Sequence, residues 1–187
     1  MNLMDAIFRR RATRAYRHFP VGDEVIHALL RAAVMAPSAM NLQPWSFVLV
    51  KGTERLRHVS GQARAYMLTN RDAALPASLK ATLEDPAFDL FYGAPALLVV
   101  CATSPAQQAA EDCAMAAQNL MLAACEHQLA SCCIGLARGW LDSAAGRSAL
   151  GLPAEWIPIV PIALGYAAEE PPAPARREPL LHVAGDD

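Results

Sequence analysis

The chain has 187 residues, 54% of them hydrophobic, which is enough apolar side chain for one compact domain with a buried core. Its formal net charge of -2 excludes partners held by a bulk excess of positive charge, such as nucleic acid or an anionic membrane. No G-x-G-x-x-G, P-loop, G-x-S-x-G or H-E-x-x-H motif is present, so common nucleotide-binding, serine-hydrolase and zinc-protease classes lack their signatures.

The opening residues MNLMDAIFRRR lack an apolar core followed by a cleavage site, so they do not resemble a signal peptide. The most apolar stretch, residues 113–124, contains Gln118 and Asn119 and falls short of a membrane span. The five cysteines show no metal-ligand spacing and are expected to be buried small hydrophobic residues, so no metal site is predicted. We expect a single domain over residues 1–187, located in the cytoplasm.

The first part of the chain predicts two helices, a loop and a strand. Apolar residues at helical spacing over residues 3–8 predict a first helix that ends at a run of arginines. The same spacing recurs over residues 23–35, with acidic residues in the first turn. Residues 38–44 are small and polar and predict a loop, whereas residues 45–50 are aromatic and branched and predict a strand.

The second part begins with residues 53–92, which predict helix, loop and short helix and are interpreted as a variable insert that decides substrate choice. Residues 96–102 form a continuous apolar run that predicts a strand buried on both faces. Residues 109–129 predict the longest helix, whose many alanines suit a central place in a core or dimer interface. Residues 131–135 predict a short strand or turn, and residues 143–150 predict a short helix. Residues 157–166 predict a last strand, and residues 169–187 predict a proline-rich tail.

Four arginines form the first candidate site. Only two of the 16 basic residues are lysine, and Arg9, Arg10, Arg11 and Arg14 lie within six positions. Arginine forks bind two phosphate oxygens at once, so this run is a candidate phosphate clamp. The alternative is a solvated helix end, because cations also offset the dipole at a helix C-terminus. These residues alone leave both interpretations open.

The segment APSAMNLQPW at residues 36–45 is the second candidate. The amides of Asn41 and Gln43 donate and accept hydrogen bonds, as the edge of a flavin ring requires, and two prolines stiffen the loop. The alternative is an ordinary helix stop followed by a turn.

The third candidate is the tail segment PPAPARREP, which carries Arg176 and Arg177. A proline-rich segment is stiff enough to carry charge to a distant site, where these arginines would complete the phosphate clamp. The alternative is a disordered tail with mixed charges and no site.

These candidates occur in the order found in the nitroreductase family of FMN-dependent flavoproteins, which the chain resembles over nearly its whole length. RRATRAY at residues 10–16 resembles the basic N-terminal motif, with Ala12 where serine is common. APSAMNLQPWSF at residues 36–47 closely matches the most specific motif of the family. QNLMLAA at residues 118–124 resembles the long dimer helix of the family, and SCCIG at residues 131–135 resembles the turn beside the flavin. LGY at residues 164–166 and RREP at residues 176–179 resemble the ending of the family's chains.

The resemblance implies an α+β fold with a central, mostly antiparallel sheet flanked by helices. It also implies a homodimer that holds FMN at the subunit interface, with the long central helix in that interface and an extended tail around the partner. NADH or NADPH is the implied reductant, and a small molecule is the acceptor. Neither nucleic acid nor a membrane is expected as a partner.

The resemblance also assigns FMN contacts residue by residue. The arginines hold the phosphate and ribityl chain, and the loop residues reach the flavin from the partner subunit. The backbone N–H of Gly135 points at the flavin N5, and Ile134 packs on the ring. Asn70, or its neighbour Arg71, lies near the pyrimidine edge. The full set is Arg10, Arg11, Ala12, Arg14, Pro37, Ser38, Ala39, Asn41, Asn70, Ile134, Gly135, Arg176 and Arg177.

The function implied is a two-step reaction in which NADH or NADPH reduces FMN and a nitroaromatic, quinone or similar electrophile then takes the electrons. No side chain is expected to act as a nucleophile, because the cofactor carries the chemistry. One alternative keeps the fold and FMN but performs flavin breakdown, dehalogenation or dehydrogenation. Others are a non-enzymatic flavin carrier or sensor and a plain helical interaction protein.

Overall fold

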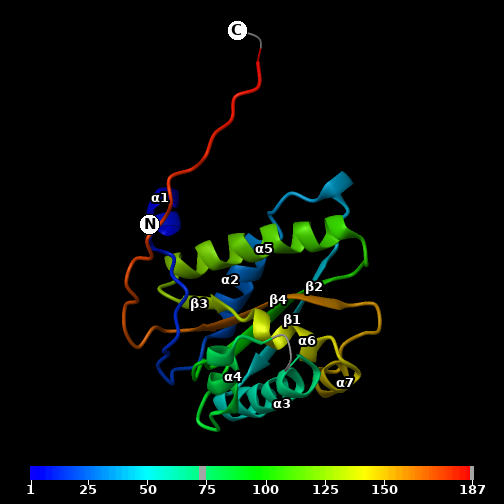
Figure 1. Cartoon of the computed structure of the whole chain (residues 1–187). Coiled ribbons are helices and arrows are strands. Elements are labelled where there is room, and N and C mark those ends of the chain that lie inside the picture. The colour runs from blue at the N-terminus through cyan, green and yellow to red at the C-terminus, as the bar shows by residue number, and fades with distance from the viewer. Residues whose placement is uncertain (72–74, 186–187) are drawn as a thin grey trace.

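The computed structural model describes residues 1–71 and 75–185 (Figure 1). Its α-helices are α1 Leu3–Arg9, α2 Asp23–Ala33, α3 Thr53–Arg71, α4 Ala77–Glu84, α5 Gln107–Glu126, α6 Arg138–Leu141 and α7 Ala144–Leu150. Its 3₁₀ turns are η1 Ala39–Asn41 and η3 Gly135–Ala137, and its strands are β1 Trp45–Lys51, β2 Ala96–Ala102, β3 Ala130–Cys133 and β4 Ile157–Gly165. None of the described helices is long and apolar enough to cross a membrane.

Within the described residues, the strands form one four-stranded sheet in the order β1-β2-β4-β3, and each neighbouring pair is antiparallel. Every residue of β2 is buried, because this strand has a partner on each side and helices on both faces. The β2–β4 register shifts between Val100 and Cys101, so Ile159 is the extra residue of a bulge. The bulge lies beside Pro158, whose nitrogen has no hydrogen to donate to a ladder.

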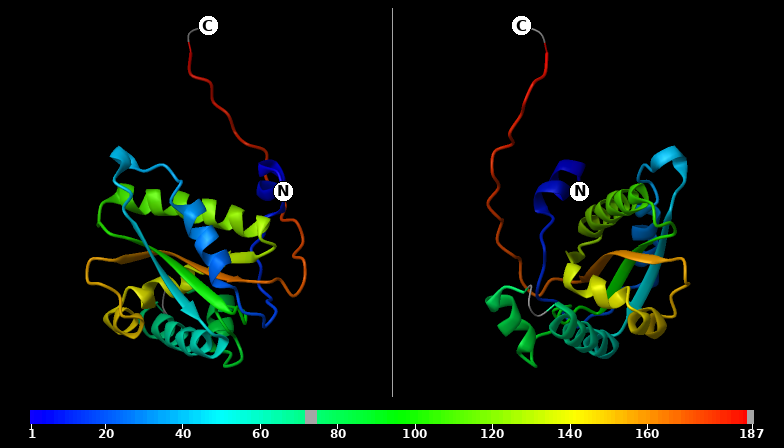
Figure 2. Two further views of the ribbon diagram at one scale, coloured as in Figure 1. Left: turned by 180° about the vertical axis from the view of Figure 1, so that it is seen from behind. Right: turned by 45° about the vertical axis from the view of Figure 1, so that its right-hand side comes forward.

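Helices cover the two faces of the sheet as separate layers (Figure 2). One layer consists of α2 and α5, whose apolar residues pack with Leu98 and Val100 of β2. The other consists of α3, α4, α6 and α7, and it packs with Leu97, Val99 and Cys101. This alternation follows from the two-residue period of a strand, which sends successive side chains to opposite faces. The small alanines of α5 let the sheet and α2 approach it closely.

α1 and the tail lie outside these layers (Figure 1). α1 buries only Ala6, while Leu3 and Phe8 are 66% and 67% exposed. Described residues 169–185 contain no helix or strand and are exposed except at Pro171. An isolated chain therefore presents an apolar helix face and an extended tail to solvent.

The structure confirms the α+β class and the antiparallel sheet flanked by helices. The strand expected at residues 96–102 has those bounds, but the helix expected at residues 109–129 runs over Gln107–Glu126. It ends early because Gln128 adopts a left-handed φ of 57°. The loop expected at residues 38–44 contains η1, and α6 was not foreseen. The expectation that the cysteines are buried is confirmed for Cys101, Cys113 and Cys132, but Cys125 is only partly buried and Cys133 is exposed at the end of β3.

Candidate functional site

The N-terminal segment that follows α1 is tied to the edge of the sheet by backbone hydrogen bonds. The N–H of Thr13 donates to the carbonyl of Ser131 on β3 at 3.1 Å. The N–H of Arg17 donates to the carbonyl of Tyr166, just after β4, at 2.8 Å. These bonds hold the arginine-rich segment beside β3 and the beginning of the tail.

Tyr16 anchors the same segment through its side chain. It is 6% exposed, and its hydroxyl donates to the carbonyl of Ala163 on β4 at 3.3 Å. Burial raises the pKa of Tyr16, so the phenol keeps its proton. Gly165 permits this packing, because a Cβ there would lie 2.5 Å from Pro95 and 3.0 Å from the Tyr16 ring.

The arginines of this segment differ in what they contact. Within the described residues, the side chains of Arg10 and Arg14 have no hydrogen bond or ion pair, and Arg14 is exposed. Nη1 of Arg11 instead donates to the carbonyls of Phe8 and Arg10 at the end of α1. Arg11 therefore fits the helix-end interpretation, whereas Arg10 and Arg14 are available to an anion.

Two features of the surroundings show that this corner is cationic and concave. Burial raises the pKa of the Cys132 thiol on β3, and the nearby charges of Arg14 and Arg10 partly offset that rise. A cleft of about 820 Å³ lies between α1, the end of α5 and the start of the tail. Arg10, Arg11 and Arg17 are among the residues that line it.

The turn after β3 presents an unpaired backbone donor. The N–H of Ile134 donates to the carbonyl of Pro161 at 2.8 Å, and the Ile134 side chain is 5% exposed, packed in the core. In the described part of the chain, the N–H of Gly135 has no hydrogen-bond partner. A Cβ at Gly135 would meet no atom within 4 Å, so the backbone here is open to a ligand.

The loop between α2 and β1 has an unusual backbone. Met40, Asn41 and Gln43 adopt φ values of 52°, 54° and 50°, in the left-handed region that residues other than glycine rarely occupy. The Gln43 N–H donates to Oγ of Ser38 at 3.0 Å, and its side-chain amide donates to Oδ1 of Asn41 at 3.1 Å. Such strain persists only where surrounding contacts hold it, and it is common at ligand-binding loops.

Asp112 of α5 is a residue of this site that sequence reasoning missed. Its carboxylate is 4% exposed and accepts from the N–H of Ala39 at 3.2 and 3.3 Å. A carboxylate inside an apolar helix face was visible in the sequence, but its partner is 73 residues away. Asp112 fixes the loop to the N-terminal half of α5.

The loop and the arginines lie at opposite ends of α5 (Figure 1). Asp112 holds the loop near one end, and Cys125 lies near the other, where the charges of Arg10, Arg9 and Arg11 lower its thiol pKa against the rise caused by burial. Cys125 is thirteen positions after Asp112, which is about 20 Å along an α-helix. One chain therefore places Arg10 and Arg14 beside β3, the strand that Gly135 follows in the chain, but leaves the loop residues Pro37, Ser38, Ala39 and Asn41 at a distance.

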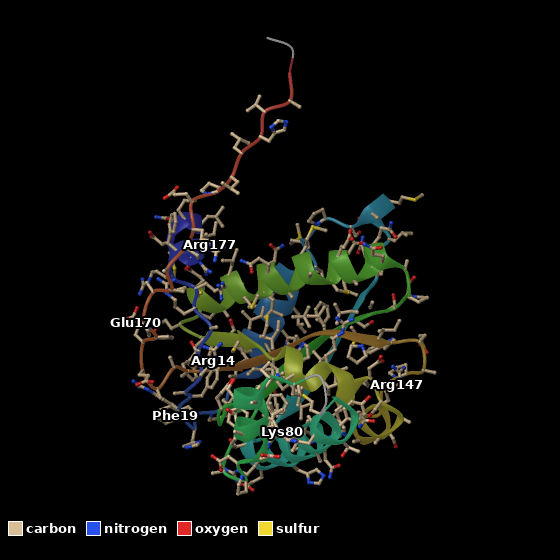
Figure 3. All side chains as sticks on the ribbon, in the orientation of Figure 1. Arg14, Phe19, Lys80, Arg147, Glu170 and Arg177 are labelled. Atoms are coloured by element: carbon tan, nitrogen blue, oxygen red, sulfur yellow. The ribbon has the colours of Figure 1, made fainter. Side chains whose placement is uncertain are left out.

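The remaining sequence candidates lie apart from this corner. Asn70 is exposed near the end of α3, and its side-chain amide donates to the carbonyl of Tyr66 at 2.8 Å. The side chain of Arg71 lies outside the described part of the structure. Arg176 and Arg177 are exposed on the tail, and Figure 3 shows Arg177 away from Arg14. Within one chain the structure does not bring the tail arginines to the N-terminal ones.

A second cavity, of about 550 Å³, is lined in part by Gly135 and Leu136 of the turn after β3. Tyr66 and Met67 of α3 form one wall, and Arg138 and Gly139 of α6 form another. Sequence reasoning missed these residues, because no motif signals them and α6 was not foreseen.

A sequence model of the nitroreductase family matches residues 7–166 of the chain. A crystal structure of a nitroreductase with bound FMN from Bacteroides fragilis is 27% identical and superposes with a TM-score of 0.84, covering 100% of both chains. The 5,6-dimethylbenzimidazole synthase of Rhodospirillum rubrum is 32% identical over 91% of this chain and 85% of its own length. Nitroreductase NfnB of Mycolicibacterium smegmatis is 30% identical over 84% of this chain and 80% of its own length.

Proposed function

The chain belongs to the nitroreductase family, and from that premise we propose that it transfers reducing equivalents from NADH or NADPH, through FMN, to a small electrophile such as a nitroaromatic or quinone. One observation carries the proposal. In the described part of the chain, the unpaired side chains of Arg10 and Arg14 lie beside β3, and the unpaired N–H of Gly135 lies in the turn that follows this strand.

These groups fit the chemistry of FMN. Arg10 and Arg14 would hold the phosphate by charge-assisted hydrogen bonds, and the Gly135 N–H would donate to a ring nitrogen. Ala12 offers no hydroxyl to the phosphate, so the arginines would supply the side-chain contacts there. Bound FMN would supply the redox chemistry, accepting a hydride at its ring and passing it on. The chain's own task is to bind, orient and electrostatically support that ring.

A second copy of the chain would complete the site. Because the loop and the arginines lie at opposite ends of α5, an antiparallel pairing of two chains along α5 would bring the loop of one to the arginines of the other. Pro37, Ser38, Ala39 and Asn41 would then reach the flavin from the partner subunit. The exposed apolar face of α1 and the extended tail supply surface for such a homodimer. Arg176 or Arg177 on the tail would then complete the clamp.

The remaining assignments concern the flavin ring. Because the Ile134 side chain is buried, its backbone is the part that would lie against the ring, while the side chain supports the turn. Asn70 would approach the pyrimidine edge from the end of α3. No side chain of the chain needs to act as a nucleophile, because the bond changes occur on the cofactor and substrates.

Specialised flavin chemistry, such as flavin breakdown, is the second candidate function. It is favoured by the 32% identity to the Rhodospirillum rubrum protein named for synthesis of 5,6-dimethylbenzimidazole. The two functions predict different results in a turnover assay. The first predicts that a nicotinamide nucleotide, NADH or NADPH, supports turnover of a nitro compound, and the second predicts that neither does.

The test is an absorbance spectrum of the purified protein with FMN, followed by anaerobic addition of NADH and NADPH in separate cuvettes. We expect flavin bands that bleach with one nucleotide and return when a nitroaromatic or quinone is added. Flavin bands that do not bleach would favour the specialised chemistry or a flavin carrier. A preparation without flavin bands after reconstitution would refute the FMN site.

A further inference from the structure

The cavity of about 550 Å³ beside Gly135 combines an aromatic wall with a cation. Tyr66 of α3 lies against Gly139 of α6, where a Cβ would be 3.2 Å from the Tyr66 ring. Glycine at this position therefore lets the ring lie close to the backbone of α6. Met67 and Leu136 add apolar surface to the same cavity. These walls suit a flat, largely apolar molecule.

Arg138 supplies the cation. Its Nε donates to the carbonyl of Pro158 on β4 at 3.1 Å, which orients the guanidinium group. Within the described residues, the two terminal nitrogens of Arg138 have no partner, and the side chain forms no ion pair. Because a guanidinium fork pairs with carboxylates through two parallel hydrogen bonds, an oriented and unpaired arginine favours an anionic ligand.

Among the described residues that line the cavity, the acidic side chain of Asp142 does not neutralise Arg138. Asp142 lies one turn further along, but its Oδ1 is paired with Nη1 of Arg147 at 3.1 Å. Arg147 is itself held by the carbonyls of Pro153 and Ala154, at 2.8 and 2.6 Å. The hydroxyl of Ser143 is likewise occupied, since it donates to the carbonyl of Trp140 at 2.6 Å. Arg138 is thus the cationic side chain of the cavity, among the described residues, that remains available for an incoming anion.

We propose that this cavity binds the electron acceptor and that Arg138 selects planar acceptors that carry a carboxylate. The proposal rests on the proposed function, because Gly135 joins the cavity to the flavin site. A cavity of about 550 Å³ lies within the range of small-molecule sites and accommodates a one- or two-ring aromatic acid. The aromatic body lies against Tyr66, and the carboxylate pairs with the fork of Arg138.

The test compares two acceptors that differ only in the carboxylate, 4-nitrobenzoate and nitrobenzene, with the FMN-loaded protein. For the unaltered protein we expect the larger kcat/KM with 4-nitrobenzoate. In Arg138→Gln the KM for 4-nitrobenzoate should rise about 10- to 100-fold, the effect of losing a charge-assisted pair, while values for nitrobenzene stay unchanged. Arg138→Lys keeps the charge without the fork and should recover part of the loss. Arg55→Gln removes an exposed arginine of α3 that forms no hydrogen bond or ion pair in the described residues and serves as the matched control.

A binding measurement separates recognition from turnover. Benzoate, which cannot be reduced, should perturb the flavin absorbance of the holoprotein, and its Kd should rise in Arg138→Gln in parallel with the KM for 4-nitrobenzoate. Benzamide, the neutral counterpart, should bind both proteins equally. Thermal unfolding of each variant shows whether loss of the hydrogen bond to Pro158 has disturbed the fold; if Arg138→Gln does not fold, the preference of the unaltered protein for benzoate over benzamide decides.

Three results would overturn the proposal. The first is an equal kcat/KM for the two acceptors in the unaltered protein. The second is an unchanged benzoate Kd in a folded Arg138→Gln variant. The third is a rise, in Arg138→Gln, of the KM for NADPH but not of the KM for 4-nitrobenzoate. The last would assign the cavity to the phosphate of the reductant. Failure of the proposed function is distinct, because it would leave the flavin unbleached by NADH and NADPH, a result obtained before any acceptor is added.

Discussion

The central strand and the segments that carry the candidate FMN contacts are built in opposite ways. Every residue of β2 is buried and paired on both sides within one chain. Arg14, by contrast, is exposed, and in the loop that carries Asn41 the side chains of Met40 and Leu42 are 91% and 69% exposed. The centre of the fold is complete in one chain, whereas the candidate site is open on its surface.

The contrast teaches that stability and ligand binding draw on different residues. Burial of apolar side chains in the centre stabilises the folded chain, and loss of one contact there leaves a cavity. At the site, exposed charges and a strained loop contribute little to folding and are available for a cofactor or a partner chain. Substitutions in the two regions should therefore change different measurements.

The largest effect is expected in the centre, from Leu98→Ala. Leu98 is 0% exposed on β2, so its truncation should lower the free energy of unfolding by about 3 kcal/mol. Its cross-strand partner Leu49 on β1 is 36% exposed and provides the matched control. Leu49→Ala should cost less than half as much, because solvent already reaches that side chain. Urea unfolding at fixed protein concentration and saturating FMN measures the free energy of unfolding of both variants. If the two variants lose equal free energy of unfolding, the distinction between the centre and the surface is removed.

The next effect belongs to the site, from Arg14→Ala. Removal of a charge-assisted phosphate contact should weaken FMN binding by about 10- to 100-fold. The free energy of unfolding of the FMN-free protein should stay nearly unchanged, since Arg14 is exposed and its side chain forms no hydrogen bond or ion pair in the described residues. Titration of FMN followed by fluorescence measures the affinity, with Arg31→Ala on the exposed side of α2 as the control. An unaltered FMN affinity in Arg14→Ala would refute the clamp.

The smallest effect is expected where the two regions meet, at Asp112. Asp112→Ala leaves the N–H of Ala39 without its acceptor and should weaken FMN binding about five-fold, the equivalent of about 1 kcal/mol. Asp112→Asn keeps a side-chain oxygen in place and should bind FMN nearly as the unaltered protein does. The same fluorescence titration compares the two variants. If both weaken binding equally, the hydrogen bond to Ala39 is not what positions the loop.

Much of the fold was predictable because its signals are local. The continuous apolar run at residues 96–102 predicted a doubly covered strand, and helical spacing predicted α2 and the body of α5. Motif resemblance supplied the fold class and the order of the candidate sites. The exact ends were less predictable, because Gln128 ends α5 through its own left-handed backbone.

The sequence by itself determined the class of the protein, the doubly covered strand at residues 96–102 and the residue types proposed to hold FMN. Only the tertiary structure decided that Arg11 donates to carbonyls at the end of α1, that the carboxylate of Asp112 accepts from the N–H of Ala39, and that Arg138 lines a cavity with Tyr66. The physical reason is one of range. Periodicity and turn chemistry act over a few residues, whereas a site arises from contacts between side chains that packing brings together from distant parts of the chain.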